Sequence, residues 1–118
     1  MNTRITGNDG ENRAAAYLVS KGFEIIERNW RTNRGEIDII AYKNDVLVFV
    51  EVKTLPNGNL DMIQRELNNQ KRQRILKTSK RFLLNHRQYS NSYIRFDVIV
   101  IDMPGLETVY HIENAFSE

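Results

Sequence analysis

Four charged side chains interrupt a stretch that otherwise has the composition of two buried β-strands. The segment 36–53 reads EIDIIAYKNDVLVFVEVK and places Glu36, Asp38, Glu51 and Lys53 among β-branched and aromatic residues. Burying an unpaired charge is costly, so charges at these positions indicate a site. Carboxylates can hold a hard divalent cation, and a lysine beside them can offset the charge of a phosphate group.

A short turn would bring two of these acids together. The runs 37–42 and 46–53 flank a polar Lys-Asn-Asp sequence, which is typical of a β-hairpin. With a two-residue turn at 44–45, Asp38 lies directly opposite Glu51, and opposed side chains of this kind have Cβ atoms about 4.5–5.5 Å apart. Lys53 and Glu36 then lie alongside. A longer turn would shift the pairing, so the predicted geometry depends on the turn.

Two opposed carboxylates repel each other, and a proton or a cation between them relieves the repulsion. Lys53 supplies one positive charge, and a divalent metal is the stronger remedy. Hard oxygen ligands favour Mg²⁺ or Mn²⁺, whereas a chain without cysteine is poorly suited to zinc. A metal held by Asp38 and Glu51 would polarise a phosphodiester and lower the pKa of a bound water, which Lys53 could position. The two histidines, His86 and His111, are expected to be surface or packing residues.

A third acid lies on the first helix. Asn8 or Asp9 is expected to cap this helix, which then runs to about Ser20 and ends before Gly22. Its core-facing stripe comprises Glu11, Ala14, Ala15 and Leu18. We therefore expect Glu11 to approach the metal, directly or through a water. The alternative is an acid near a helix N-terminus, where the helix dipole favours negative charge. For Glu36, a salt bridge and a role at the site both stay open.

The basic residues are distributed unevenly along the chain. The net charge is only +2, yet residues 67–96 contain no acid and eight lysines and arginines. This asymmetry indicates an anionic partner, most often nucleic acid, although a solvated basic helix is the alternative. Lys71 interrupts an apolar stripe and either points at the acids or a phosphate, or snorkels to solvent. The residues predicted to bind nucleic acid are Lys71, Arg72, Arg74, Lys77 and Arg81. Arg95 and Asp97 are expected to form a structural ion pair.

The elements that position these residues follow the order α-β-β-β-α-β-β. This order predicts a mixed α/β sheet with helices packed against it, and 118 residues suit one domain, 1–118. The absence of cysteine, of a long apolar run and of a signal-peptide pattern leads us to expect a soluble cytoplasmic protein with no membrane partner. The expected elements are a helix over 8–20, strands over 23–31, 37–42 and 46–53, a helix that begins at 62 or 69 and ends at 85, and strands over 93–102 and 108–112.

Asp38, followed after the hairpin by Glu51-Val52-Lys53, resembles the PD-(D/E)xK motif of restriction-endonuclease-like nucleases, whose core has the order αβββαβ. Over nearly its full length the chain is similar to the UPF0102 (YraN-type) bacterial family. That family resembles archaeal Holliday-junction resolvases and is described as endonucleases without an established substrate. The matching segments are GENRAAAYL, KGFEIIERNWR, GEIDII, VFVEVKT, RFDVIVID and IENAF.

The resemblance implies a role for each residue of the motif. It implies metal binding by Asp38, by Glu51 and by the carbonyl of Val52, and a catalytic role for Lys53. Glu11 matches the first-helix acid of the resolvase-like branch.

The chain departs from the family pattern at two places. Leu55 stands where the family usually has arginine, and the loop over 56–61 is altered, so we expect the substrate contacts to differ from the family pattern while the metal set is kept. Ile37 replaces the proline of the motif, a substitution that is common in this fold.

Three functional hypotheses follow. The first is a metal-dependent endonuclease that acts on DNA, including branched or damaged structures, and uses Mg²⁺ or Mn²⁺. The second is a nucleic-acid-binding protein that keeps the nuclease fold without turnover. The third is an interaction module in which the acids form a structural ion cluster, but two opposed carboxylates on one sheet face fit it poorly. A homodimer is expected by analogy with resolvase-like nucleases, and the sequence does not decide between DNA and RNA.

Overall fold

A computed structural model describes the backbone of residues 3–117 and the side chains of residues 9–117. Within it, five strands form one mixed sheet in the order β1-β2-β3-β4-β5, with three α-helices around it. β3 and β4 are parallel and the other neighbours are antiparallel. The elements are α1 Thr3–Ser20, β1 Glu24–Thr32, β2 Gly35–Lys43, β3 Val46–Thr54, α2 Leu60–Glu66, α3 Asn69–Asn85, the 3₁₀ turn η1 Arg87–Tyr89, β4 Tyr93–Ile101 and β5 Val109–Phe116.

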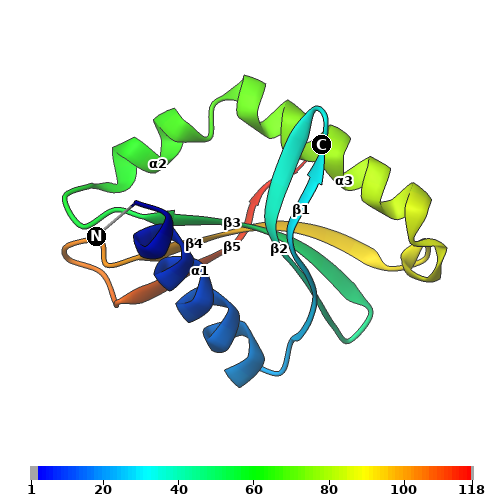
Figure 1. Ribbon diagram of the computed structural model, residues 1–118, viewed down its shortest axis with the longest axis horizontal. Helices are drawn as coiled ribbons and strands as arrows, with labels where there is room; N and C mark the ends of the chain where they lie inside the picture. Colours follow the sequence, from blue (N-terminus) through cyan, green and yellow to red (C-terminus); the bar gives the residue numbers. More distant parts are fainter. Residues whose placement is uncertain (1–2, 118) are drawn as a thin grey trace.

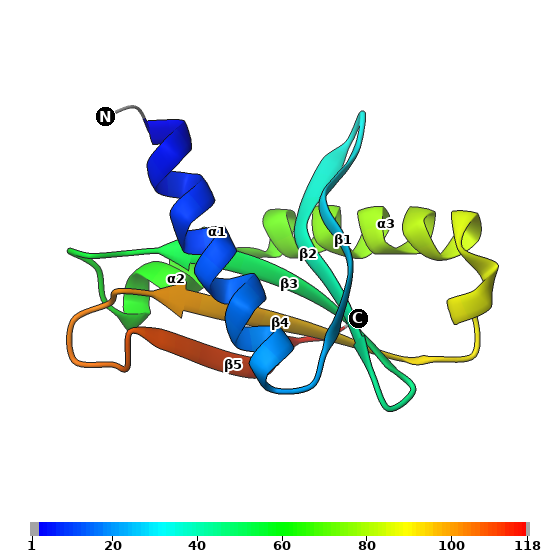
Figure 2. The same cartoon turned by 60° about the horizontal axis from the view of Figure 1, so that its bottom comes forward.

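The helices cover the two faces of the sheet, which gives three layers. α1 packs on one face, while α2 and α3 lie on the other (Figures 1 and 2). Successive side chains of a strand point to opposite faces, so each strand contributes to both cores. Ile39 and Val50 join Leu18 of α1 in one core, whereas Ile40 and Phe49 join the other. The mixed α/β sheet with flanking helices that the sequence predicts is confirmed.

The connection between the parallel strands contains two helices where one was expected. Asn59 caps α2, and Asn68 caps α3 by accepting the Lys71 N–H at 3.0 Å. The predicted start at Asn69 is confirmed for α3. The alternative of one helix from Met62 is wrong, because α2 ends at Glu66 with Leu67 as its C-cap and Asn68 begins a new helix.

The first helix begins earlier than its sequence signals indicate. It starts at Thr3, so the predicted cap at Asn8 or Asp9 is wrong and Asp9 lies inside the helix. Gly10 lies inside this helix at a close approach to the end of β3, where a Cβ would collide with the Thr54 hydroxyl. The predicted C-terminal stop is confirmed, since Gly22 has a φ of 93° and follows the last turn.

The last strand is longer than expected. It continues to Phe116, beyond the predicted end at Ile112, because a register shift opposite Phe96 and Val98 accommodates the extra residues. Asn114 takes a positive φ of 52° within this irregular part. Among residues 3–117, no helix is both long and apolar enough to cross a membrane.

Candidate functional site

Asp38 lies at a fork in the sheet. The β2–β3 ladder runs from Lys43–Val46 to Ile39–Val50, in the register predicted from a two-residue turn. Beyond it, β2 continues with β1 as a two-stranded ribbon that rises away from the sheet (Figure 2), while β3 continues beside β4. Asp38 is the first residue of β2 past the ladder, and its Oδ2 accepts the Val52 N–H at 2.8 Å. The carboxylate thus occupies the place of a strand partner for β3.

Asp38 and Glu51 lie close enough to interact, and Asp38 is half-buried while Glu51 is buried. If the β2–β3 pairing is extended by one residue beyond Ile39–Val50, Asp38 lies opposite Glu51. Glu51 is only 8% exposed. Burial, reinforced by the negative charge of Glu51, raises the pKa of Asp38 to about 7. Burial also raises the pKa of Glu51, although Lys71 and Lys53 oppose this rise. The ionised form of this pair is therefore poorly stabilised by the protein alone.

Two lysines share one oxygen of Glu51. Lys53 Nζ lies 3.7 Å and Lys71 Nζ lies 3.6 Å from Glu51 Oε1, and Lys53 also lies 3.3 Å from Glu66 of α2. Lys71 comes from the first turn of α3, so this helix contributes to the acid site as well as to the basic surface. The sequence left open whether Lys71 points at the acids or a phosphate, or extends to solvent. In the structure it points at Glu51.

Glu11 lies on the α1 side of the fork. The predicted core-facing stripe is confirmed, since Glu11 is 8% exposed and its stripe neighbours Ala14 and Leu18 are buried. Its Oε1 accepts from Arg28 Nε at 3.0 Å and from Asn29 Nδ2 at 2.9 Å. Because α1 begins at Thr3, Glu11 is well inside the helix, and the alternative of a dipole-stabilised N-terminal acid is wrong. Its negative charge contributes to the raised pKa of Asp38.

Arg28 and Asn29 are site residues that the sequence reasoning missed. Arg28 looked like an ordinary solvent-facing residue of a strand. Asn29 did carry a signal, because asparagine is depleted in strand interiors, and here it adopts a φ of 53°. Glu36 pairs with Arg31 at 3.5 Å on the hairpin, which supports its salt-bridge alternative.

The donor set at the fork suits a hard cation. Among residues 9–117, no three His, Cys, Asp or Glu side chains are arranged as a ready-made metal cluster. Mg²⁺, however, commonly takes only one or two carboxylates and completes its shell with water and substrate phosphate. Asp38 and Glu51 provide that pair, and the raised pKa of Asp38 fits a carboxylate that gains from a nearby cation. Val52, the third predicted ligand, lies beside them and commits its N–H to Asp38.

The predicted nucleic-acid residues of α3 divide into separate groups. Arg74, Lys77 and Arg81 are exposed and follow the i, i+3, i+7 spacing of one helix face. Arg72 instead lies over the Phe116 ring at 5.7 Å, and its buried Nε has no hydrogen-bond partner within the described part of the chain. It lines a pocket of about 260 Å³ that is bordered mainly by apolar residues.

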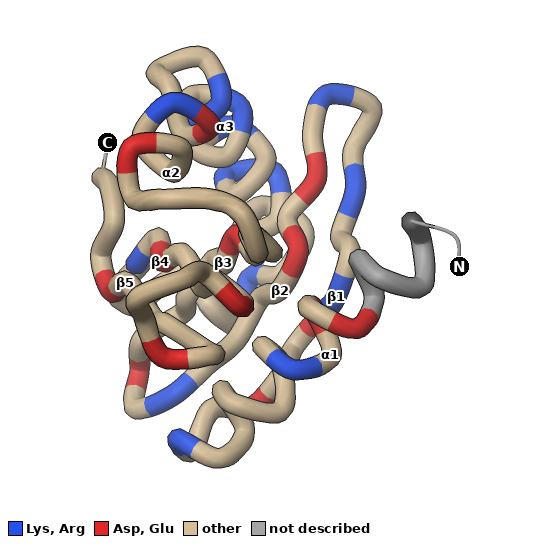
Figure 3. Tube along the Cα trace, turned by 90° about the vertical axis from the view of Figure 1, so that its left-hand side faces the viewer, with Lys and Arg blue, Asp and Glu red and all other residues tan. Residues whose placement is uncertain are grey.

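The β1–β2 ribbon extends the basic surface. Gly35 at its tip packs on Thr78 of α3, and Arg34 beside it is exposed. Figure 3 shows basic segments along α3 and at the tip of the ribbon, with acidic segments of β2 below. The acid pair therefore has basic surface on two neighbouring elements.

The predicted ion pair between Arg95 and Asp97 is confirmed by two hydrogen bonds of 2.9 Å. His86 is a packing residue as expected, since its ring stacks on Phe82 with the ring centroids 3.9 Å apart. His111 is buried and lies 2.6 Å from Asp97, a polar contact that the sequence did not reveal.

The fold and site together define a class: a mixed five-stranded α/β domain with a partly buried acid pair and two lysines where its sheet divides. A family model described as "Uncharacterised protein family UPF0102" matches residues 10–101, and the chain belongs to this family. It is 45% identical to a UPF0102 protein of Treponema denticola over 95% of both chains. It is 40% identical to one of Treponema pallidum over 98% of this chain and 94% of the relative, and 42% identical to one of Alkaliphilus oremlandii over 98% and 100%. The resemblance is thus confirmed at the level of the family.

Proposed function

We propose that this protein is a metal-dependent endonuclease with a restriction-endonuclease-like core that hydrolyses phosphodiester bonds in DNA, with branched or damaged structures as its substrates. The observation that carries the proposal is the pair of the half-buried Asp38 and the buried Glu51 at the fork, with Lys53 and Lys71 against Glu51. A structural ion cluster has no need of two carboxylates whose burial raises their pKa values. A phosphodiesterase does need them, because they can hold a cation against a phosphate.

Each residue has a distinct part in this proposal. Asp38, Glu51 and the Val52 carbonyl would hold Mg²⁺ or Mn²⁺, which supplies Lewis-acid stabilisation of charge on the phosphate. Lys53, fixed between Glu51 and Glu66, presents a positive charge beside the carboxylates. Its ammonium is suited to offset charge that develops on the scissile phosphate.

Lys71 neutralises Glu51 before substrate binds and is positioned to contact phosphate afterwards. Glu11 acts as a positioning residue, because its bonds to Arg28 and Asn29 fix β1 beside the fork. The exposed face of Arg74, Lys77 and Arg81 supplies sequence-independent contacts to the backbone of the nucleic acid. A homodimer is part of the proposal, since resolvase-like nucleases often cut as dimers.

A second candidate is a nucleic-acid-binding protein without turnover. The observation in its favour is that two lysines already neutralise Glu51. The two candidates share the basic surface and differ in whether Asp38 and Glu51 hold a cation for catalysis. Cleavage and metal binding therefore separate them.

The test is a cleavage assay with Mg²⁺ and Mn²⁺ on linear, flapped, four-way-junction and single-stranded DNA, with RNA counterparts. The variants Asp38→Asn and Glu51→Gln should lower cleavage roughly 100-fold or more, while nucleic-acid binding is retained. Glu36→Gln removes a half-exposed acid of the same strand that pairs with Arg31, and it is the matched control, which should cleave normally. Binding of these substrates without cleavage by the wild type would favour the second candidate. Cleavage that survives Asp38→Asn would exclude the proposed site.

A further inference from the structure

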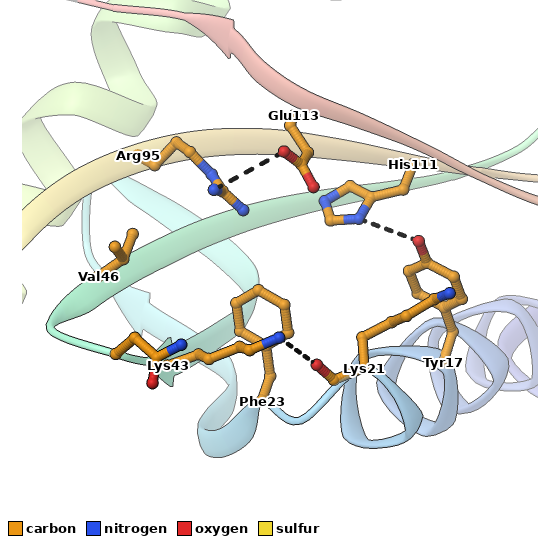
Figure 4. A pocket seen from close by; sticks show the side chains of 9 residues that line it. Tyr17, Lys21, Phe23, Lys43, Val46, Arg95, His111 and Glu113 are labelled. Atoms are coloured by element: carbon orange, nitrogen blue, oxygen red, sulfur yellow. Dashed lines mark hydrogen bonds and ion pairs between the residues drawn. The ribbon is translucent and has the colours of Figure 1, made fainter.

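A second pocket lies at the other end of the β2–β3 ladder, on the α1 face of the sheet. It has a volume of about 400 Å³ and lies between the C-terminal end of α1, the β2–β3 turn, β4 and β5 (Figure 4). Lys43 and Val46 border it, whereas Asp38 and Glu51 lie five residues further along each strand. At the rise of a β-strand this is roughly 16 Å. The pocket is therefore separate from the acid site.

Three cations from separate parts of the chain line this pocket: Lys21 after α1, Lys43 of β2 and Arg95 of β4. Lys43 donates a hydrogen bond from Nζ to the Lys21 carbonyl, which holds its ammonium at the end of α1. Lys21 Nζ lies 5.6 Å from the centroid of the Tyr17 ring. Arg95 contributes its Nη1, which lies 3.9 Å from the exposed Glu113, the acid among the lining residues. The positive charges of the lining exceed the negative charge, which suits an anionic ligand.

A buried acid fixes the inner wall of the pocket. Asp97, 1% exposed, accepts two bonds from Arg95 and one from the Asn114 N–H, each at 2.9 Å. It also contacts His111, whose Nδ1 is 3.3 Å from the Tyr17 hydroxyl. The charges of Asp97 and Arg95 offset each other, so the excess positive charge of the pocket comes from Lys21 and Lys43. It holds Arg95 in one orientation, and such preorganisation lowers the cost of binding.

An aromatic ring lies among the cations. Figure 4 shows Phe23 directed into the pocket, and Lys43 Nζ lies 5.4 Å from its ring centroid. An aromatic side chain stacks on any base, because every base has a π-face. The pocket is also larger than phosphate needs and falls within the range of small-molecule sites.

We propose that this pocket binds a phosphate monoester joined to a nucleobase, with the phosphate at Lys21, Lys43 and Arg95 and the base against Phe23. Two sources share this chemistry: a free mononucleotide and the 5′-phosphorylated end of a nucleic acid chain. Binding here requires neither Asp38 nor Glu51, so the inference stands apart from the proposed cleavage activity.

The test is a calorimetric titration of the full chain with adenosine monophosphate, with adenosine as the ligand that lacks phosphate and ribose 5-phosphate as the ligand that lacks the base. The nucleotide should bind, and both truncated ligands should bind at least about tenfold more weakly, because each loses one group of contacts. Lys21→Gln and Lys43→Gln should each weaken nucleotide binding by about tenfold. Phe23→Leu should weaken it while leaving the affinity for ribose 5-phosphate unchanged.

The matched control is Lys80→Gln, which removes the same charge from an exposed position on α3, across the sheet. It should bind the nucleotide as the wild type does, and so should Asp38→Asn with Glu51→Gln. Lys21 is exposed, so Lys21→Gln keeps the test valid if Lys43→Gln destabilises the end of α1.

Competition distinguishes the two sources. Displacement of the nucleotide by a 5′-phosphorylated oligonucleotide, and not by the same oligonucleotide with a 5′-hydroxyl, would assign the pocket to a chain end. No displacement by either would assign it to the free nucleotide. The proposal is overturned if the wild type binds the nucleotide with a Kd weaker than about 1 mM, or if adenosine binds as tightly as its monophosphate. It is also overturned if neither Lys21→Gln nor Lys43→Gln changes the affinity for the nucleotide.

Discussion

The Asp38 carboxylate accepts the Val52 N–H at 2.8 Å, at the point where β2 separates from β3. A side chain thereby replaces the backbone partner that a continued ladder would provide. This contact explains how a small sheet can divide and still keep an acid next to Glu51. The stability of the fold therefore depends on whether Asp38 is charged, because the same burial that brings the acids together raises their pKa values.

Asp38→Asn is expected to stabilise the protein at neutral pH in the absence of divalent metal. The folded-state pKa of Asp38 is about 7 and its ordinary value is 3.8, so between these values the folded state binds more protons than the unfolded state. The contribution of Asp38 to the free energy of unfolding of the wild type should therefore be most favourable below about pH 4. It should fall as the pH rises to about 7. The asparagine variant lacks this fall and should gain about 1–3 kcal/mol at pH 8.

Urea unfolding at pH 5 and pH 8 measures this effect. Asparagine can still accept the Val52 N–H, so the comparison isolates the charge. Glu36→Gln, at a more exposed acid of β2, keeps Asp38 and should therefore lose as much stability between pH 5 and pH 8 as the wild type does. A variant that is less stable than the wild type at pH 8 would contradict the account of Asp38.

Glu11→Gln is expected to reduce the free energy of unfolding by about 1–2 kcal/mol, because a buried charged acceptor for Arg28 and Asn29 is lost. If Glu11 positions β1 beside the fork, cleavage should also fall while the affinity for DNA stays the same. Glu24→Gln, at an exposed acid of β1, provides the control for both measurements. Equal stability of Glu11→Gln and the wild type would show that these hydrogen bonds do not fix the strand.

Lys77→Ala is expected to weaken nucleic-acid binding and to reduce the dependence of affinity on salt by about one unit of slope, since one phosphate contact is lost. Fluorescence anisotropy at several salt concentrations measures both quantities. Lys21→Ala removes the same charge from an exposed position on the opposite side of the sheet, and it should be neutral on DNA with 5′-hydroxyl ends. An unchanged slope for Lys77→Ala would remove this helix face from the interface.

The geometry of the acid pair could be predicted because it depends on local rules. Asn44 and Asp45 both adopt a positive φ, as a two-residue hairpin turn requires, and the turn then sets the register that brings Asp38 opposite Glu51. Alternation along the strands predicted the shared face, and helical spacing predicted that Glu11 faces the core.

Other features depend on contacts between distant segments and could not be predicted in this way. Gly10 of α1 approaches Thr54, 44 positions later in the chain, and no local pattern reveals this contact. The partners of Glu11 come from an irregular part of β1. Asp97 and His111 meet across two strands, so the pocket that they support has no signature in any one stretch of sequence.

The most direct test of the central claim is a calorimetric titration with Mn²⁺ and with Mg²⁺, at pH 8 and in the presence of uncleavable DNA. The proteins compared are the wild type and the double variant that carries Asp38→Asn and Glu51→Gln. The account predicts saturable binding by the wild type, none by the double variant, and normal binding by the Glu36→Gln control. The same metal affinity in the wild type and the double variant, or no metal binding by the wild type, would contradict the claim that these two acids hold the cation.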